Sequence, residues 1–204
     1  MKNMIVFVGR PNVGKSTIIR DLMGIKTVVG KKPGATRRIK VYSFAEKLKV
    51  VDLPGFGYMH GISKERIEEI KKEIVKFLEN NYKKILVALH VIDGSTYNEI
   101  SRRLEKKGII MFDKELSYFL RELNIDTITV INKIDNIPKK NIDDIITRIY
   151  NDLGYSGNWK DNIYNFVILS AKKKQNYNQL RKAIALRLKS YGYDSLIKFL
   201  RRWK

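Results

Sequence analysis

The 204-residue sequence contains no cysteine and no hydrophobic run long enough to cross a bilayer. The lack of cysteine excludes a disulfide framework, a thiolate metal site and a prenyl or palmitoyl anchor. The longest apolar run, residues 85–92, is far shorter than a membrane span, and Lys2 excludes N-myristoylation. The first apolar segment begins at residue 4, which leaves no room for a signal peptide. We therefore expect a cytoplasmic protein that does not associate with membranes.

Acidic residues are scarce at both ends of the chain, and this scarcity accounts for the whole net charge of +20. Residues 1–50 contain 12 Lys and Arg but 2 acidic residues, and residues 171–204 contain 11 and 1. The segment between them is balanced, with 18 residues of each sign. Basic charge segregated in this way is typical of proteins that bind a polyanion, although lysines on solvated helix faces give similar compositions.

Residues 9–16 read Gly-Arg-Pro-Asn-Val-Gly-Lys-Ser and follow directly on the apolar run at residues 4–8. This is the phosphate-binding pattern G-x-x-x-x-G-K-S/T, placed between a strand and a helical segment as its chemistry requires. The glycines let backbone N–H groups turn toward phosphate oxygens. Lys15 is then expected to reach the β- and γ-phosphates, and the Ser16 hydroxyl to ligate Mg²⁺.

Apolar strand-like segments alternate with amphipathic helical segments, which predicts an α/β fold on a mostly parallel sheet. Strands are expected at residues 4–8, 39–44, 48–52, 85–92, 126–131 and 163–169, and the second and third form an antiparallel hairpin at the sheet edge. Helices are expected at residues 15–23, 63–80, 114–123 and 142–153 and around 180–188, with Ser63 as an N-cap. Residues 94–111 are interpreted as an irregular insertion.

Two further elements are placed to act on Mg²⁺ and the γ-phosphate. Asp52-Leu53-Pro54-Gly55 ends the third strand; Asp52 can hold Mg²⁺ through a water, and the Gly55 N–H can contact the γ-phosphate. Thr36 lies in the loop before the second strand, where its hydroxyl can bind Mg²⁺ and its N–H the γ-phosphate. Such contacts order a loop with the triphosphate and release it after hydrolysis.

The sequence Asn132-Lys133-Ile134-Asp135 follows the fifth strand and favours guanine. A carboxylate such as Asp135 accepts from both guanine N1–H and the exocyclic amine, whereas adenine presents no such pair of donors. We expect Asn132 to position the loop, Lys133 to cover the ring and the Ala171 N–H of Ser170-Ala171-Lys172 to reach guanine O6. These elements each follow a strand and occur in order, so together they predict a guanine-nucleotide site.

At this point the chain resembles the EngB (YihA/YsxC) family of ribosome-assembly GTPases, in a variant like its archaeal members. The resemblance rests on residues 9–17, on Lys31-Lys32-Pro33-Gly34-Ala35-Thr36-Arg37-Arg38 and on Asp52-Leu53-Pro54-Gly55-Phe56-Gly57-Tyr58. It implies a three-layer P-loop GTPase fold with a mostly parallel six-stranded sheet and one antiparallel edge strand. Two features depart from the family: its bacterial members usually have Thr where Asn132 stands, and residues 94–111 are additional.

The predicted site is defined residue by residue. Catalytic roles are assigned to Lys15, Thr36, Gly55 and Asn12, and Mg²⁺ ligation to Ser16, Thr36 and Asp52. GTP or GDP is expected to contact Gly9, Arg10, Pro11, Asn12, Val13, Gly14, Lys15, Ser16, Thr17, Gly34, Ala35, Thr36, Asp52, Leu53, Pro54, Gly55, Asn132, Lys133, Ile134, Asp135, Ser170, Ala171 and Lys172.

The residue after Gly55 is Phe56, where many signalling GTPases have the glutamine that orients the attacking water. Another group must then activate water, or intrinsic hydrolysis must be slow. His60 is a weak alternative as a base, since a lone histidine in a loop is more often unrelated to catalysis. The resemblance implies instead that Asn12 helps to bind K⁺ beside the β- and γ-phosphates, where a cation stabilises developing charge; the other interpretation is that Asn12 merely suits the backbone of the loop.

The first and last helices of this fold pack on the same side of the sheet, so the two basic ends should meet. We expect one positive face that includes Arg20, Lys26, Arg181, Lys182, Arg187 and Lys189, bordered by Lys31, Lys32, Arg37 and Arg38. Arg10, Arg37 and Arg38 are candidate arginine fingers, but we expect them to face RNA. Residues 1–190 form the predicted GTP-binding domain, and residues 191–204 a basic amphipathic helix packed on it, with Leu196, Phe199, Leu200 and Trp203 on its apolar side.

The leading functional hypothesis is a monomeric GTPase that hydrolyses GTP to GDP and phosphate and switches on a ribosomal subunit precursor or its rRNA, with no DNA partner expected. One alternative is a regulatory GTPase that acts on protein partners, which the missing glutamine and lipidation site disfavour. Another is a G domain related to membrane-transport GTPases, which the lack of a membrane segment disfavours. A GTPase fused to an RNA-binding module would need residues that this chain does not have.

Overall fold

The computed structural model describes residues 2–26, 38–45, 48–55 and 63–201. Six strands form one sheet: β1 (Met4–Val8), β2 (Lys40–Phe44), β3 (Leu48–Asp52), β4 (Ile85–Asp93), β5 (Thr127–Asn132) and β6 (Phe166–Ile168). Their order is β2-β3-β1-β4-β5-β6. Only the β2–β3 pairing is antiparallel among these strands, so the predicted parallel sheet with an antiparallel edge hairpin is confirmed.

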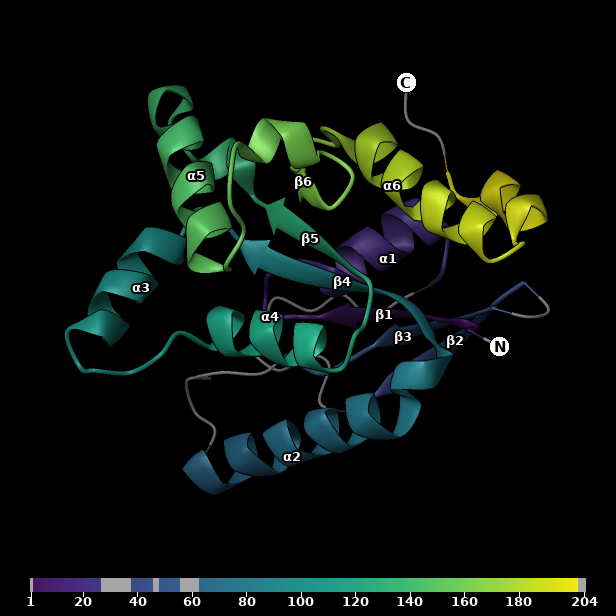
Figure 1. Ribbon diagram of the computed structural model, residues 1–204, viewed down its shortest axis with the longest axis horizontal. Helices are drawn as coiled ribbons and strands as arrows, with labels where there is room; N and C mark the ends of the chain where they lie inside the picture. The colour runs from purple at the N-terminus through teal and green to yellow at the C-terminus, as the bar shows by residue number, and fades with distance from the viewer. Residues whose placement is uncertain (1, 27–37, 46–47, 56–62, 202–204) are drawn as a thin grey trace.

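Helices cover both faces of this sheet (Figure 1). They are α1 (Lys15–Met23), α2 (Lys64–Asn81), α3 (Tyr97–Glu105), α4 (Phe112–Glu122), α5 (Ile142–Asp152) and α6 (Tyr177–Ser190). The buried residues of α1 and α6 share one cluster with alternate residues of β1 and β4, while α2, α4 and α5 pack on the opposite face. The prediction that the first and last helices share a face is therefore confirmed. No helix within the described ranges is long and apolar enough to span a membrane.

The central strands are buried on both faces because they lie between two helical layers. Every residue of β1 and of β4 is buried, as the apolar runs in the sequence predict. The edge strand β2 instead alternates between partly buried and exposed positions, and Val41 is exposed. The Ser63 side chain accepts a hydrogen bond from the Arg66 N–H, which confirms Ser63 as the N-cap of α2.

Three sequence-based expectations are wrong in detail. Residues 94–111 are not irregular, because they contain α3 with Tyr97 and Ser101 buried. The next helix, α4, begins at Phe112 and not at Lys114. The last strand, β6, covers only Phe166–Ile168, since it is an edge strand that pairs with β5 alone and is preceded by an exposed Ile163.

After α6 the chain forms a short 3-10 helix, Asp194–Phe199, in the segment where a basic amphipathic helix is predicted. Leu200 is buried in the core cluster of α1 and α6, whereas Phe199 is exposed. The Arg201 N–H donates to the Leu22 carbonyl at 2.8 Å, which attaches this segment to the end of α1. Trp203 lies outside the described residues, and the division into a domain and a tail helix stays a prediction.

Candidate nucleotide site

Four loops meet at the carboxyl edge of the sheet, where α/β proteins bind ligands. They follow β1, β3, β5 and β6, and they contain the phosphate-binding pattern, residues 52–55, residues 132–135 and residues 170–172. Because β1 lies between β3 and β4, the strand order changes direction beside the phosphate-binding loop. The sheet thus brings together the predicted site residues that lie in the described part of the chain.

Two glycines of the phosphate-binding loop are required by its geometry. Gly9 has φ +134°, and a Cβ there would lie 2.2 Å from the Val91 carbonyl oxygen. Gly14 has φ +105°, and its Cβ would lie 2.3 Å from Nδ2 of Asn132. Gly14 also caps the N-terminus of α1, so the loop leads directly into helix N–H groups that attract anions.

Lys15 is the buried cation of this loop. Its Nζ donates to the carbonyl oxygens of Gly9 and Arg10, both at 2.9 Å. Burial lowers the pKa of Lys15 to about 8, although the negative charges of Asp52 and Asp113 oppose this shift. The ammonium is therefore held over the loop by carbonyl groups, and the negative charge of a phosphate beside it would raise the pKa again.

Ser16 and Asp52 lie side by side at the start of α1 and the end of β3. The Ser16 Oγ donates to Oδ2 of Asp52 at 2.6 Å, and Asp52 is buried. Hydroxyl and carboxylate oxygens are the donor types that Mg²⁺ prefers, so this pair fits the predicted metal site. The third predicted ligand, Thr36, lies outside the described residues, as do Gly34 and Ala35.

Gly55 packs directly against the phosphate-binding loop. A Cβ at Gly55 would lie 2.5 Å from Cα of Pro11, so only glycine permits this approach. The contact places the Gly55 backbone beside the loop, as a role at the γ-phosphate requires. Phe56 and His60 follow outside the described residues, and the questions of water activation that they raise stay predictions. Asn12, in the same loop as Pro11, is exposed and has φ +59°.

Asn132 connects the phosphate-binding loop with the base-binding loops. Its Nδ2 donates to the Val13 carbonyl at 2.7 Å, and its Oδ1 accepts from the Ala171 N–H at 3.0 Å. Asn132 is buried, and these bonds use both ends of its amide. The structure therefore gives the Ala171 N–H a partner inside the protein, whereas the sequence predicts guanine O6 for it.

Asp135 and Ser170 place a carboxylate at the predicted guanine position. The Ser170 Oγ donates to Oδ1 of Asp135 at 2.5 Å and accepts from the Lys173 N–H at 3.0 Å. Ser170 is buried and Asp135 is partly exposed. The hydroxyl thus orients the carboxylate while the other oxygen, Oδ2, stays available to accept from a base.

Asp93 holds Lys133, an interaction that sequence reasoning missed. Lys133 Nζ lies 2.7 Å from Oδ2 of Asp93, and Oδ1 of the same carboxylate accepts from the N–H and the hydroxyl of Ser95. Asp93 is the last residue of β4, so its position at the carboxyl end of a parallel strand was the available signal. The Lys133 stem is aligned by this ion pair beside the predicted base site.

Asp21 of α1 accepts hydrogen bonds from residues that follow β6. It accepts hydrogen bonds from Lys174, from the Tyr177 hydroxyl at 3.0 Å and from Arg20 Nε at 3.0 Å. Burial opposes ionisation, yet these bonds, with Lys174 foremost, hold the pKa of Asp21 below its ordinary value. The loop after β6 is therefore fixed to α1, the helix that follows the phosphate-binding pattern.

Arg10 does not face outward as predicted. Its Nε lies 2.7 Å from Oδ2 of Asp113 on α4, with side-chain exposures of 13% and 0%. His90 of β4 completes the cluster, since its Nε2 lies 3.6 Å from Oδ1 of Asp113. Sequence reasoning assigned Arg10 to RNA because its partner is on a distant helix. The arginine instead ties the phosphate-binding loop to α4.

The predicted positive face forms only in part. Arg187 pairs with Asp126 at 3.1 Å, Arg20 with Asp21, and Arg181 donates to the Leu200 carbonyl at 3.3 Å, so these arginines fix the structure. The remaining described members of that face stay exposed, namely Lys26, Lys182, Lys189 and Arg38. Lys31, Lys32 and Arg37 lie outside the described residues.

Comparison with known proteins identifies what this arrangement is similar to. A family model described as 50S ribosome-binding GTPase matches residues 4–133, and one for the elongation factor Tu GTP binding domain matches residues 88–190. A probable GTP-binding protein EngB of Pyrococcus abyssi is 44% identical over 180 residues, covering 88% of this chain and 83% of that protein. Its counterpart in Methanopyrus kandleri is 36% identical, covering 97% and 98%.

Solved structures agree with these matches. A crystal structure of a probable GTP-binding protein EngB has a TM-score of 0.82 and 42% identity, covering 92% of this chain and 99% of that one. A structure of Era in complex with MgGDPNP and nucleotides of 16S ribosomal RNA has a TM-score of 0.57 and 25% identity, covering 100% and 59%. The chain therefore binds and hydrolyses GTP, and it belongs to the EngB family of P-loop GTPases.

Proposed function

We propose that this GTPase is a nucleotide switch in ribosomal subunit assembly, which it performs by binding rRNA or the ribosomal subunit. The observation that carries the switch is the bridge made by Asn132, because one side chain contacts the phosphate-binding loop and the base-binding loop together. The ribosomal assignment is supported by the matching family, described as 50S ribosome-binding GTPase, and by the likeness to Era, whose structure contains 16S ribosomal RNA. The net charge of +20 suits a polyanionic partner.

The residues in the site have distinct proposed roles. Lys15 and the N-terminus of α1 bind the β- and γ-phosphates, and Gly55 offers its N–H to the γ-phosphate. Ser16 and Asp52, with Thr36 from outside the described residues, hold Mg²⁺, which when bound neutralises charge between the β- and γ-phosphates. Asp135 accepts from the guanine edge, and Lys133 lies along the ring. GTP binding then orders the loop of Thr36, and hydrolysis releases it.

We further propose that K⁺ assists hydrolysis through Asn12. Asn12 is exposed at the tip of the phosphate-binding loop with a left-handed backbone, so its side chain is available to a cation beside the phosphates. A cation there would stabilise the charge that develops on the phosphates, in place of an arginine finger. GTP turnover in KCl should exceed turnover in NaCl at equal ionic strength, and Asn12→Ala should remove the difference. Equal rates in the two salts would refute this role.

The ribosomal role is tested by co-sedimentation with purified ribosomal subunits. The full chain is incubated with each subunit in the presence of a non-hydrolysable GTP analogue, of GDP or of neither. We expect association with one subunit in the analogue state and release with GDP. Asp135→Asn provides the control, because weaker guanine binding should abolish the dependence on the analogue. Lack of association in every state would refute the assembly role and leave the GTPase activity untouched.

A further inference from the structure

Helix α3 has two different faces. Its inward face contains the buried Tyr97 and Ser101 and the partly buried Ile100 and Leu104. These residues follow one another at the spacing of a single helix face. The Tyr97 ring packs in a cluster with Ile92, Ile131 and residues of α5. Figure 1 shows α3 at the side of the molecule, next to α5 and away from α2. The helix is therefore part of the packed domain and not a loose insertion.

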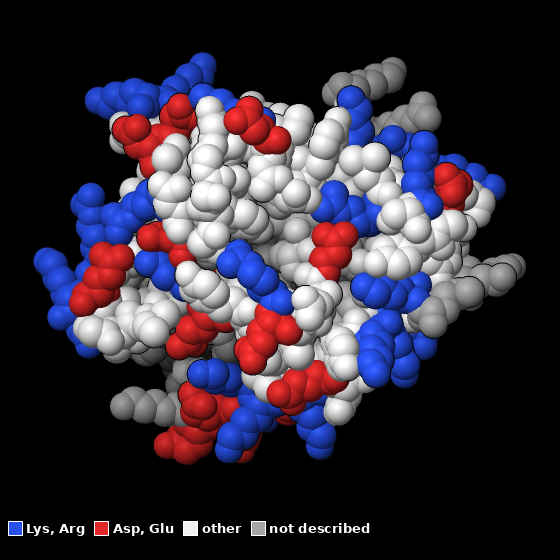
Figure 2. Space-filling model, in the orientation of Figure 1, with Lys and Arg blue, Asp and Glu red and all other residues white. Residues whose placement is uncertain are grey.

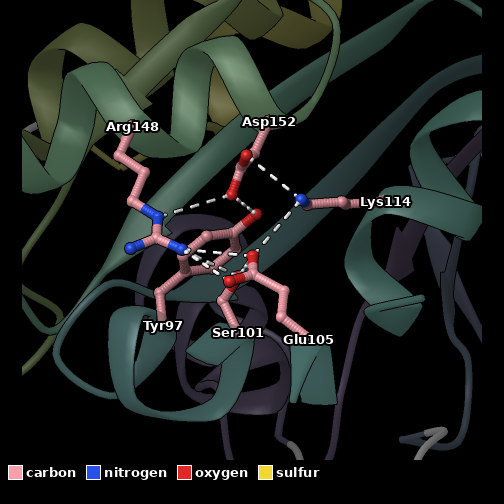
Figure 3. A network of polar contacts seen from close by, with 6 residues as sticks. All are labelled: Tyr97, Ser101, Glu105, Lys114, Arg148 and Asp152. Atoms are coloured by element: carbon pink, nitrogen blue, oxygen red, sulfur yellow. Dashed lines mark hydrogen bonds and ion pairs between the residues drawn. The ribbon is translucent and has the colours of Figure 1, made fainter. Parts of the chain in front are cut away.

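A polar network fixes α3 to its neighbours (Figure 3). Glu105 of α3 accepts from Ser101 at 2.7 Å and from Arg148 of α5 at 3.1 Å, and it faces Lys114 of α4 at 3.9 Å. Asp152 of α5 accepts from the Tyr97 hydroxyl at 3.2 Å and pairs with Lys114 at 3.1 Å. Hydrogen bonds from Ser101 and the charge of Arg148 keep the pKa of Glu105 below its ordinary value.

Two acidic side chains near α3 are engaged in this network, while Glu99 of α3 stays exposed. Glu105 and Asp152 are both paired with cations of α4 and α5. Four cations lie at the C-terminal end of α3 and in the turn that follows it. They are Arg102, Arg103, Lys106 and Lys107, all of them exposed and none in an ion pair with any residue that the structure describes. We call these four residues the α3 basic face.

The spacing of the α3 basic face places its charges together. Positions 102 and 106 are one helical turn apart, and the Lys106 N–H bonds to the Arg102 carbonyl at 3.2 Å. Lys107 follows in the turn after α3, where its N–H bonds to the Leu104 carbonyl at 2.9 Å. At the left of Figure 2, where Figure 1 has α3, several Lys and Arg side chains lie around acidic ones. Ile109 and Ile110 follow directly and are exposed at 51% and 64%, so apolar surface adjoins the charge.

We propose that the α3 basic face docks on ribosomal RNA, as a contact separate from the basic ends of the chain. Exposed cations without an ion pair match a surface of phosphates, because no ion pair among the described residues has to be broken on binding. The exposed Glu99 lies one helical turn before Arg102 and Arg103 and offsets part of their charge. A protein partner is less well matched, since like charges one turn apart repel until a polyanion neutralises them. This inference rests on the proposed ribosomal function and assigns it a surface.

The test compares two variants of the full chain with equal charge change. One carries Arg102→Gln, Arg103→Gln, Lys106→Gln and Lys107→Gln. The control carries Lys72→Gln, Lys76→Gln, Lys83→Gln and Lys84→Gln, four exposed cations on and after α2. Affinity for naked ribosomal RNA is measured across KCl concentrations, and GTP hydrolysis without RNA reports intact folding. A third variant, Arg102→Lys with Arg103→Lys, keeps the charge.

We expect the α3 variant to bind at least tenfold more weakly, and its slope of log affinity against log salt to fall by about 0.7 for each phosphate that the helix no longer neutralises. The α2 control should retain a slope near that of the unaltered protein, and the lysine variant should bind as the unaltered protein does. Equal reductions of RNA affinity in the α3 variant and the control would refute the inference. Weaker binding of the α3 variant to the ribosomal subunit, with unchanged binding to naked RNA, would also refute it, because it indicates a protein partner. Failure of the unaltered protein to bind naked RNA would refute this inference, and failure to associate with ribosomal subunits as well would refute the proposed function.

Discussion

The substitution Asp113→Asn removes the charge that compensates buried Arg10. The two side chains are 2.7 Å apart with exposures of 0% and 13%, so water cannot replace the missing partner. Removing one member of a buried ion pair costs about 3–5 kcal/mol, because the remaining charge stays desolvated. We expect the free energy of unfolding of the nucleotide-free protein to fall by about that amount.

A matched control separates burial from distance. Asp143 and Lys160 form an ion pair at 2.9 Å, nearly the same separation, but with exposures of 61% and 54%. Exposed pairs contribute about 0–1 kcal/mol, so Asp143→Asn should have little effect. Urea denaturation followed by circular dichroism measures both variants, and equal slopes against urea confirm that the unfolded states are comparable.

A double variant checks the cause. Asp113→Leu with Arg10→Met removes both charges, and it should recover most of the stability that Asp113→Asn loses, because no unpaired charge remains. The reasoning is refuted if Asp113→Asn costs no more than Asp143→Asn. It is also refuted if the double variant is less stable than Asp113→Asn, since the loss would then come from packing and not from charge.

Three further outcomes follow from the site. Burial lowers the pKa of Lys15 from 10.5 to about 8, so between these pH values the unfolded chain binds more protons than the folded protein. The free energy of unfolding of the nucleotide-free protein should therefore rise as pH rises across this range. Urea denaturation at pH 7 and pH 9.5 measures the gain, which Lys15→Met should lack. Asp135→Asn should weaken the binding of GTP about 100-fold, because it removes two charge-assisted hydrogen bonds. The variant should favour XTP, whose carbonyl accepts a hydrogen bond from the new amide, and calorimetry measures both affinities. Gly14→Ala should abolish GTP binding, whereas Gly108→Ala, also at positive φ but with nothing within 4 Å, should cost only about 1 kcal/mol of stability.

The strands and the nucleotide loops could be predicted because their signals are local. The run at residues 4–8 and the motif at residues 9–16 lie next to each other, and each specifies its own backbone. The bridge made by Asn132 was only partly predictable. Its partner Val13 is 119 positions away, so the role of positioning follows from the motif but its hydrogen bonds do not.

Helix α3 could not be predicted because its inward face is partly polar. Ser101 and the Tyr97 hydroxyl are stabilised there by Glu105 and Asp152, and the sequence does not show that α5 lies beside them. Arg10 was misplaced for the same reason, since a buried arginine is expected only when its acidic partner is known. The failures therefore concern polar groups that are paired between distant elements.

The amide of Asn132 also has a thermodynamic consequence for ligand recognition. One rigid group links the loop predicted to surround the phosphates to the loop predicted to surround the base, so ordering either half would partly order the other. Guanosine and pyrophosphate, offered as separate fragments, should therefore each bind more tightly when the other is present. A threonine at this position has a single hydroxyl in place of the amide, so relatives that carry it would recognise base and phosphate more independently.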